Sequence, residues 1–479
     1  MTAVLILAVT AVGGCHQTDQ SGADYVDQLR ARVTTDAVFG HLRHLQDIAD
    51  AHDGTRQTGT PGYTASVDYV VSALTNLGFD IQTPEFEMGV FHVDSESLSV
   101  NGTPVAAHAV EYSAPSAVAG VTGPIVVAPD DETPGCQAAD YDGLPIAGAV
   151  AVVTRGACYL ADKAAAATQR GAVGLVIVNN ADEKAFSGAF LETDEVKIPV
   201  VSVSKADGAA LRAQSGVAKL VVVCRTEHVR ARNVIATTRS GSREDTVMVG
   251  AHLDSVRRGP GIEDNGSGVA ATLEIALQMG STPPIKNAVS FAFWGGEEEW
   301  LIGSTSYVKS LDLKALKDVA LYLNFDMVGS PNAGYFTLDG DASTPPDPEI
   351  GDMPDGSAAI ERAFVDALAK AQKTARDLEF DGRGDYSAFA STGIPVGQLF
   401  TGSEEVKTVE EARLWGGQAG MPFDPNYHSP DDNFANVSRD VINVTLPIIT
   451  DVVGHYAQDV HGTYGVPDRA DRDRQLLVD

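Results

Sequence analysis

Between residues 230 and 465, short apolar runs alternate with stretches of helical periodicity. The runs have the length and composition of buried β-strands. They cover residues 246–250, 288–293, 319–323 and 394–399. The clearest helical stretch, residues 269–279, follows a glycine-rich turn. This alternation predicts an α/β domain with a mixed, mostly parallel sheet and helices on both faces.

The pattern is different before residue 230. Residues 66–74 place apolar side chains at helical spacing, Gly78 is suited to end that helix, and residues 79–86 predict a strand. From 109 to 225, valine-rich runs alternate with Gly, Asp and Pro turns, with one clear helical stretch at 160–170. We therefore expect a small β-rich domain at 109–225, inserted into an α/β domain formed by residues 29–108 and 226–465.

The two ends of the chain differ from the rest. Residues 1–14 are apolar and lead into Cys15, which is typical of an export signal too short to span a bilayer. Residues 12–15 also resemble a bacterial lipobox, although no Lys or Arg precedes the apolar run. This resemblance implies an exported, extracellular or cell-surface lipoprotein anchored through Cys15. Residues 16–28 predict a polar tether, and residues 466–479 predict a charged, frayed tail.

Composition limits the classes of partner. The 479 residues include 65 Asp and Glu but only 34 Lys and Arg, for a net charge of −31. Nucleic acid is not an expected partner, because phosphate binding needs clustered cations. Cys136 and Cys158 lie in one compact segment and could pair in an oxidising compartment. Cys224 ends a valine-rich run and is expected to be a buried thiol in a strand.

Candidate metal ligands follow three of the predicted strands. The first strand leads into His252 and Asp254, the second into residues 297–299, which are all Glu, and the third into Asp326. In an open α/β sheet, ligands bind beyond the carboxyl ends of the strands. Carboxylates and imidazoles that converge there would repel one another unless a cation lay among them.

Two further candidates lie in loops. Asp264 is part of a glycine-rich turn at 261–268 that precedes the helical stretch, and His428 belongs to the segment 427–432. Together with the strand ends they make two histidines and three carboxylates, plus one neighbouring Glu. Imidazole and carboxylate without thiolate suit zinc or a related divalent ion in a hydrolytic site.

The order of these segments resembles the co-catalytic two-zinc aminopeptidases, the secreted bacterial and vacuolar exopeptidases with a phosphorylase/hydrolase-like fold. The matching stretches are 250–255, 263–268, 293–298, 301–304, 324–329 and 427–428, with an N-terminal echo at 56–63. Residues 154–158, 163–167, 171–174 and 179–180 resemble a protease-associated domain. That resemblance implies a substrate-restricting or partner-binding role for the insert, and an inert spacer is equally consistent with it.

The resemblance implies two zinc ions per chain. His252 and Asp326 would hold one ion, Glu298 and His428 the other, and Asp264 would bridge them. It also implies a cis peptide bond between Asp264 and Asn265.

The resemblance assigns roles to six further residues. Glu297 would be the general base that takes a proton from the attacking water. Tyr427 would donate a hydrogen bond to the developing oxyanion. Asp254 would orient His252 and Asp432 would orient His428. Arg383 and Asp385 match a motif that lines the substrate cleft.

The implied substrates are the N-termini of peptides or proteins. The cleft is rich in carboxylates, and Arg383 is the one cation near these motifs in the sequence, so a protonated α-amino group has more partners than a terminal carboxylate. Three alternatives remain: a carboxypeptidase of the same superfamily, a one-zinc glutaminyl cyclase, and a receptor-like scaffold without activity.

Overall fold

The computed structural model describes residues 16–181, 185–186, 188–190, 196–344 and 351–477. The predicted lipid anchor at Cys15 lies outside these residues. The chain divides into two compact units, a larger one formed by the residues up to 88 and from 230 onward, and a smaller one formed by residues 89–229. Within the described chain, no helix is both long enough and apolar enough to span a membrane.

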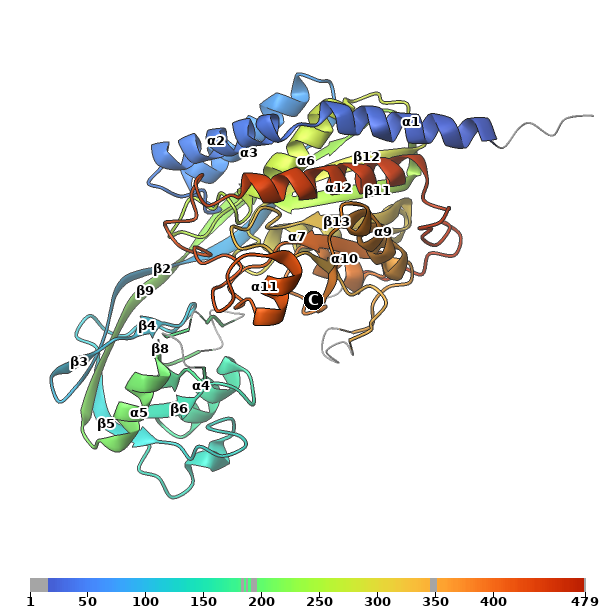
Figure 1. The fold of residues 1–479 in the computed structure, drawn as a ribbon. Helices are drawn as coiled ribbons and strands as arrows, with labels where there is room; N and C mark the ends of the chain where they lie inside the picture. Colours follow the sequence, from blue (N-terminus) through green and yellow to red (C-terminus); the bar gives the residue numbers. More distant parts are fainter. Residues whose placement is uncertain (1–15, 182–184, 187, 191–195, 345–350, 478–479) are drawn as a thin grey trace, which may run out of the picture. The chain divides into compact units, whose positions relative to one another are not determined.

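The larger unit contains an eight-stranded mixed sheet with the strand order β1-β10-β12-β11-β13-β16-β14-β15. Figure 1 labels its central strands β11, β12 and β13. The four central strands, β12, β11, β13 and β16, run parallel to one another. β11, β12 and β13 each contain one predicted apolar run, and β16 covers residues 396–399 of the fourth. The strands are β1 (Asp80–Gln82), β10 (Val234–Thr237), β11 (Ser242–His252), β12 (Asn287–Trp294), β13 (Val319–Phe325), β14 (Phe336–Leu338), β15 (Arg376–Leu378) and β16 (Val396–Phe400).

Helices cover both faces of this sheet, as the sequence predicts. One face carries α6 (Gly266–Met279), α9 (Ser357–Lys370) and α12 (Arg439–Gln458), and the other carries α7 (Ile302–Lys309), α8 (Leu313–Asp318) and α10 (Tyr386–Ser391). Because both faces are covered, every residue of β12 and β13 is buried. The sheet therefore holds its carboxyl ends rigidly.

Helices α1 (His16–Arg32), α2 (Thr35–Ala51) and α3 (Pro61–Thr75) precede the sheet, and α3 contains the predicted helix at 66–74. The predicted tether at 16–28 differs from the structure, because α1 packs against α12. Tyr25 and Leu29 are buried four residues apart on one side of α1, a pattern that the polar composition of the segment conceals.

The C-terminal residues also differ from their prediction as a frayed tail. Arg472 is buried and donates hydrogen bonds to the backbone carbonyls of Glu244 and Lys317 at 2.8 and 2.7 Å. Its guanidinium also pairs with Asp245 at 2.6 Å. Charged side chains near a chain end therefore fix this segment to the larger unit instead of leaving it in solvent.

The smaller unit is a second eight-stranded sheet with the order β3-β2-β9-β5-β6-β7-β8-β4. Its four strands β5, β6, β7 and β8 are parallel and carry α4 (Leu160–Gln169) and α5 (Lys205–Ala213). The strands are β2 (Glu85–Val100), β3 (Thr103–Val105), β4 (His108–Ala109), β5 (Val121–Val127), β6 (Val150–Thr154), β7 (Gly174–Val178), β8 (Val200–Val203) and β9 (Val217–Arg232).

The boundaries of the insert lie further out than the predicted residues 109 and 225. Strands β2 and β9 are each continuous across the boundary between the units, so the pattern change in the sequence falls inside the smaller unit. Cys136 and Cys158 form the expected disulfide, with their Cα atoms 6.0 Å apart. Cys224 lies in β9 but is only half-buried, and burial raises the pKa of its thiol to about 11.

Three carboxylates meet where the loop after β14 contacts α9. The ligand atoms of Asp339, Asp341 and Glu361 lie within 4.8 Å of one another. Glu361 accepts hydrogen bonds from the backbone N–H groups of Gly340 and Asp341, both at 3.0 Å, so its carboxylate holds the turn. Burial, reinforced by Asp341, raises the pKa of Glu361 from 4.5 to about 7.

This shift predicts a pH dependence of stability. Because the pKa is higher in the folded state, the folded protein binds more protons than the unfolded chain between about pH 4.5 and 7. The free energy of unfolding should therefore fall as the pH rises through that window. Glu361→Gln should flatten the dependence, as measured by denaturant unfolding across it. The exposed Glu379→Gln is the control, and an unchanged slope in Glu361→Gln would contradict the prediction.

Candidate active site

His252 is the last residue of β11 and is buried. Its Nε2 lies 3.2 Å from Asp264 Oδ1 and 3.3 Å from Asp326 Oδ1. Asp326 follows β13, the strand next to β11, and Asp264 lies in the turn that leads into α6. Two adjacent strands and one helix N-terminus thus bring these three side chains together.

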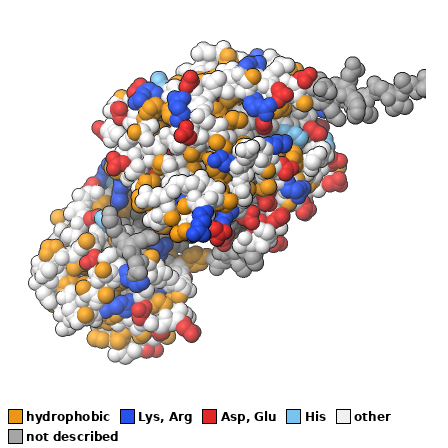
Figure 2. Space-filling view, viewed as in Figure 1, with side chains coloured by type: hydrophobic (Ala, Val, Ile, Leu, Met, Phe, Trp, Pro, Cys, Tyr) orange, Lys and Arg blue, Asp and Glu red, His pale blue; other side chains and the backbone are white. Residues whose placement is uncertain are grey.

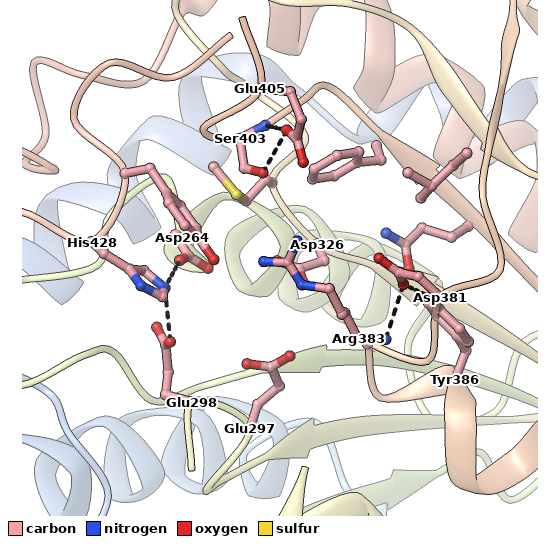
Figure 3. Close-up of a pocket in the computed structure, with 16 residues that line it drawn as sticks. Asp264, Glu297, Glu298, Asp326, Asp381, Arg383, Tyr386, Ser403, Glu405 and His428 are labelled. Atoms are coloured by element: carbon pink, nitrogen blue, oxygen red, sulfur yellow. Dashed lines mark hydrogen bonds and ion pairs between the residues drawn. The ribbon is translucent and has the colours of Figure 1, made fainter. Parts of the chain in front are cut away.

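His428 completes a second group with the residues after β12. Its Nε2 lies 3.1 Å from Asp264 Oδ2 and 3.0 Å from Glu298 Oε2 (Figure 3). The two carboxylate oxygens of Asp264 therefore face two different imidazoles. This is the arrangement expected of a ligand that bridges two metal ions, and the five residues predicted as ligands all take part in it.

The donor set fits divalent cations. Its ligand atoms are imidazole nitrogens and carboxylate oxygens, which suit zinc. The groups His252, Glu297 and Asp326, and His252, Asp264 and Glu298, each place their ligand atoms within 4.8 Å of one another. The buried Glu298 Oε1 has no hydrogen-bond partner among the described residues, as expected for an oxygen that needs a cation.

Burial and mutual repulsion govern the ionisation of the site. Burial, opposed by His252 and reinforced by Asp326, raises the pKa of Glu297 well above its usual value. Burial also raises the pKa of Glu298 to about 6. Burial works against the charged form of His252, but Glu297 and Asp326 outweigh it and raise the pKa of the imidazole. Binding of divalent ions here would release protons, because metal ligands must be deprotonated.

Glycine and a cis peptide bond shape the turn around Asp264. The Asp264–Asn265 bond is cis, as the resemblance implies. Asn265 caps α6 by accepting a hydrogen bond from the N–H of Gly268 at 2.9 Å. A Cβ atom on Gly268 would lie 2.1 Å from the carbonyl oxygen of Phe325, so only glycine allows this approach to the end of β13.

Asp254 lies beneath His252, where it was predicted to orient the ring. It is fully buried, and its Oδ1 is 3.7 Å from His252 Nδ1, which is longer than a hydrogen bond. The same oxygen accepts the backbone N–H of Glu297 at 3.4 Å. Asp254 therefore links the loop after β11 to the loop after β12.

Asp432 has a different position from the one predicted. Its two carboxylate oxygens accept the backbone N–H groups of Glu263 and Asp264, at 2.8 and 3.1 Å, and Asn436 donates to it at 3.1 Å. Both oxygens are thus already engaged with the turn that carries Asp264. Asp432 supports Asp264 and not the ring of His428.

A pocket opens over these residues. Figure 3 shows the carboxylates of Glu297 and Glu298 pointing toward the space that Asp264 and His428 also face. The described residues that line it are Asp264, Glu297, Glu298, Asp326, Met327, Leu378, Asp381, Arg383, Gly384, Tyr386, Gln398, Phe400, Ser403, Glu405, Tyr427 and His428. Tyr427 stacks on His428 with ring centroids 3.8 Å apart.

Of the two residues predicted to line the substrate cleft, Arg383 does so in the structure and Asp385 does not. Arg383 lines the pocket and its guanidinium pairs with Glu404 at 3.3 Å. Asp385 is buried and does not line the pocket, so its carboxylate is not a wall of the cleft. Burial raises its pKa to about 7.

Several lining residues could not be predicted from the sequence. Leu378 ends β15 and Phe400 ends β16, and Ser403 and Glu405 follow β16. Leu378 comes from the edge strand β15, Phe400 from the end of the interior strand β16, and the other two from an irregular loop, and no motif marks any of them. The pairing of β13 with β16 brings Phe400 close to the strand that Asp326 follows, and the pairings of β14 with β16 and with β15 add Leu378.

Known proteins resemble the chain along most of its length. Residues 233–453 match peptidase family M28, and residues 121–211 match the PA domain. A probable lipoprotein aminopeptidase, LpqL, of Mycobacterium tuberculosis is 54% identical over 459 residues, which are 96% of this chain and 92% of that protein. An aminopeptidase of Pseudomonas aeruginosa PAO1 is 39% identical over 424 residues, 85% of this chain and 78% of that protein.

The fold is also that of solved aminopeptidase structures. The aminopeptidase from Aneurinibacillus sp. strain AM-1 superimposes with a TM-score of 0.74 at 24% identity, covering 90% of this chain and 96% of that one. BSAP, a zinc aminopeptidase from Bacillus subtilis, gives 0.69 at 24% identity and covers 91% and 98%.

The chain belongs to peptidase family M28, and its smaller unit contains a PA domain. It is a zinc metallo-aminopeptidase, a hydrolase that acts on peptide bonds.

The contacts of Asp432 generate a test. Asp432→Asn keeps the shape of the side chain but replaces one acceptor oxygen with an NH₂ group. The backbone N–H of either Glu263 or Asp264 therefore loses its acceptor. The expected cost is about 1–3 kcal/mol of stability. Zinc affinity should fall as well, because the carboxylate of Asp264, a predicted ligand, loses its support. Denaturant unfolding and chelator competition measure the two effects. The exposed Asp431→Asn is the control, and equal stability of the two variants would show that Asp432 does not hold the turn.

Proposed function

We propose that the enzyme removes the N-terminal residue of peptides with the help of two zinc ions and with Glu297 as general base. The observation that carries this proposal is the position of Asp264, whose two oxygens lie 3.2 and 3.1 Å from the Nε2 atoms of His252 and His428. A carboxylate in this position is suited to bridge two ions. His252 and Asp326 would hold one ion, and Glu298 and His428 the other.

When bound, the ions would supply Lewis acidity, which lowers the pKa of a water molecule and stabilises negative charge on the substrate carbonyl. Glu297 lies beside the ligands, with its Oε2 3.9 Å from His252 Nε2. Its carboxylate would accept a proton from the attacking water and deliver it to the nitrogen of the leaving amine. Asp254 accepts the backbone N–H of Glu297 and so holds the segment that carries the base.

Tyr427 would bind the substrate carbonyl. Its ring stacks on His428, and the residue lines the pocket. Burial raises the pKa of Tyr427 well above its usual value, which keeps the hydroxyl protonated and able to donate a hydrogen bond. A donor at this place would stabilise the oxygen that becomes negative as the peptide bond is attacked.

The charge balance of the pocket favours a free N-terminus. Six of its described lining residues are Asp or Glu, and Arg383 is the one Arg or Lys among them. Arg383 already pairs with Glu404, so a substrate carboxylate would have to compete for it. Asp381 and Glu405 also line the pocket, and their charge favours a protonated amine over a carboxylate there.

We also propose that the protein is exported and anchored through Cys15. The relative from M. tuberculosis is described as a probable lipoprotein. The Cys136–Cys158 disulfide is typical of proteins that fold in an oxidising compartment.

On the face drawn in Figure 2, Asp and Glu gather at the margin of the larger unit, and Lys and Arg are scattered. We expect peptides and no nucleic acid as partners.

Substitution of the base tests the mechanism. Glu297→Gln is nearly isosteric and should retain both zinc ions, because Glu297 is not assigned as a ligand. Loss of a proton acceptor should lower kcat by roughly 10²–10⁴-fold. Steady-state kinetics, with zinc content measured on the same sample, checks both statements. A variant with two ions and near wild-type kcat would disprove the role of Glu297.

Blocking of the substrate ends tests polarity. N-acetylation of a good peptide substrate should abolish most turnover, because it removes the charge that the carboxylates bind, and C-terminal amidation should change little. Product analysis by mass spectrometry measures both. Equal cleavage of the acetylated peptide would favour a carboxypeptidase.

A zinc titration separates the remaining alternatives: two ions are expected, one would indicate a cyclase, and none would indicate a binding scaffold.

A further inference from the structure

The segment at residues 52–60, which joins α2 to α3, carries none of the residues with a proposed catalytic role, yet it touches both loops that do. The Oγ1 of Thr58 accepts the backbone N–H of Gly296 at 2.8 Å, directly before Glu297. Gln57 donates to Glu299 Oε1 at 2.8 Å, directly after Glu298. The segment therefore borders the loop after β12 on one side.

Arg56 connects the same segment to the loop after β11. Its side chain is fully buried. The guanidinium donates hydrogen bonds to three backbone carbonyls: Leu253, Pro260 at 2.8 Å and Gly261 at 2.5 Å. The backbone N–H of Arg56 donates to Ser255 Oγ at 3.0 Å.

These contacts lie at both ends of one loop. Leu253 directly follows the ligand His252, and Gly261 lies three residues before the bridging ligand Asp264. One rigid planar group thus fixes the start and the end of the segment between two ligands. A lysine could not replace it, because an ammonium group lacks the planar fork that reaches several carbonyls in one plane.

The charge of Arg56 has a second effect. The carboxylates that act most strongly on it are Asp254, Asp432, Asp264 and Glu298. Burial lowers the pKa of Arg56 to about 10, so the guanidinium keeps its proton at neutral pH. A fixed positive charge therefore lies among acids that would otherwise repel one another.

We propose that Arg56 is the positioning residue of the metal centre. It holds the loop between His252 and Asp264 so that these two ligands are already at the distance needed to bind metal before any ion is present. This inference rests on the two-zinc site of the proposed function. It predicts that the loop at residues 253–261 is ordered in the metal-free enzyme. It also predicts that loss of the guanidinium lowers zinc affinity, an effect that loss of another buried arginine, which lowers only the melting temperature, does not have.

The test compares Arg56→Met and Arg56→Lys with Arg472→Met. Arg472 is a matched control, because it is also buried and also donates to backbone carbonyls, but in the C-terminal segment. Chelator competition should show zinc binding about 10–100-fold weaker in both Arg56 variants. In Arg472→Met, the melting temperature should fall while zinc affinity stays within about twofold of wild type.

The outcomes separate this inference from the proposed function. A wild-type protein that binds no zinc would refute both. A wild-type protein with two ions, together with Arg56 variants of equal zinc affinity, would refute the inference alone.

Hydrogen–deuterium exchange on the wild-type protein covers the case in which the Arg56 variants do not fold. Amides of residues 253–264 should be protected in the metal-free enzyme nearly as well as in the zinc-loaded one. Protection that develops only on addition of zinc would show that the ions, and not Arg56, order the loop.

Discussion

The repulsion among buried carboxylates is the constraint on which this site depends. Asp264, Glu298 and Asp326 meet at one edge of the sheet together with Glu297, and beneath them lie Asp254 and Asp432. Water cannot solvate these groups well, so cations and hydrogen-bond donors must balance them. The two histidines, the buried arginine and the backbone N–H groups around the turn before α6 do so in part. The negative charge that these groups leave unbalanced is the reason that this edge of the sheet suits divalent ions.

The sheet determines which residues experience this constraint. β11 lies between β12 and β13, so the residues that follow these three parallel strands emerge side by side. Apolar strands buried on both faces leave little freedom at their ends. Short loops then place His252, Glu298 and Asp326 within reach of one another, and the turn before α6 adds the carboxylate that lies between the two histidines. The rigidity of the core is thereby passed on to the ligand positions.

Much of this arrangement follows from the sequence, and the exceptions have physical causes. The central strands could be predicted because continuous apolar runs leave few alternatives, and the candidate ligands because they follow those runs directly. Asp432 could not be placed, since a buried carboxylate finds backbone donors according to loop geometry that no periodicity encodes. The helical packing of α1 was concealed because, among its residues 22–32, Tyr25 and Leu29 are the ones that mark the buried side. The pocket residues Leu378 and Phe400 depend on strand pairing between distant segments.

Strands β2 and β9 give the insert a simple topology. They are hydrogen-bonded neighbours, and the chain leaves the larger unit along one and returns along the other. Entry and exit therefore lie next to each other, in the manner of the two stems of a hairpin. A lobe of 141 residues, from 89 to 229, can be accommodated there without displacing any strand of the peptidase sheet. Because the two attachment points are adjacent, a whole domain can be inserted there as if it were one long loop of the peptidase domain.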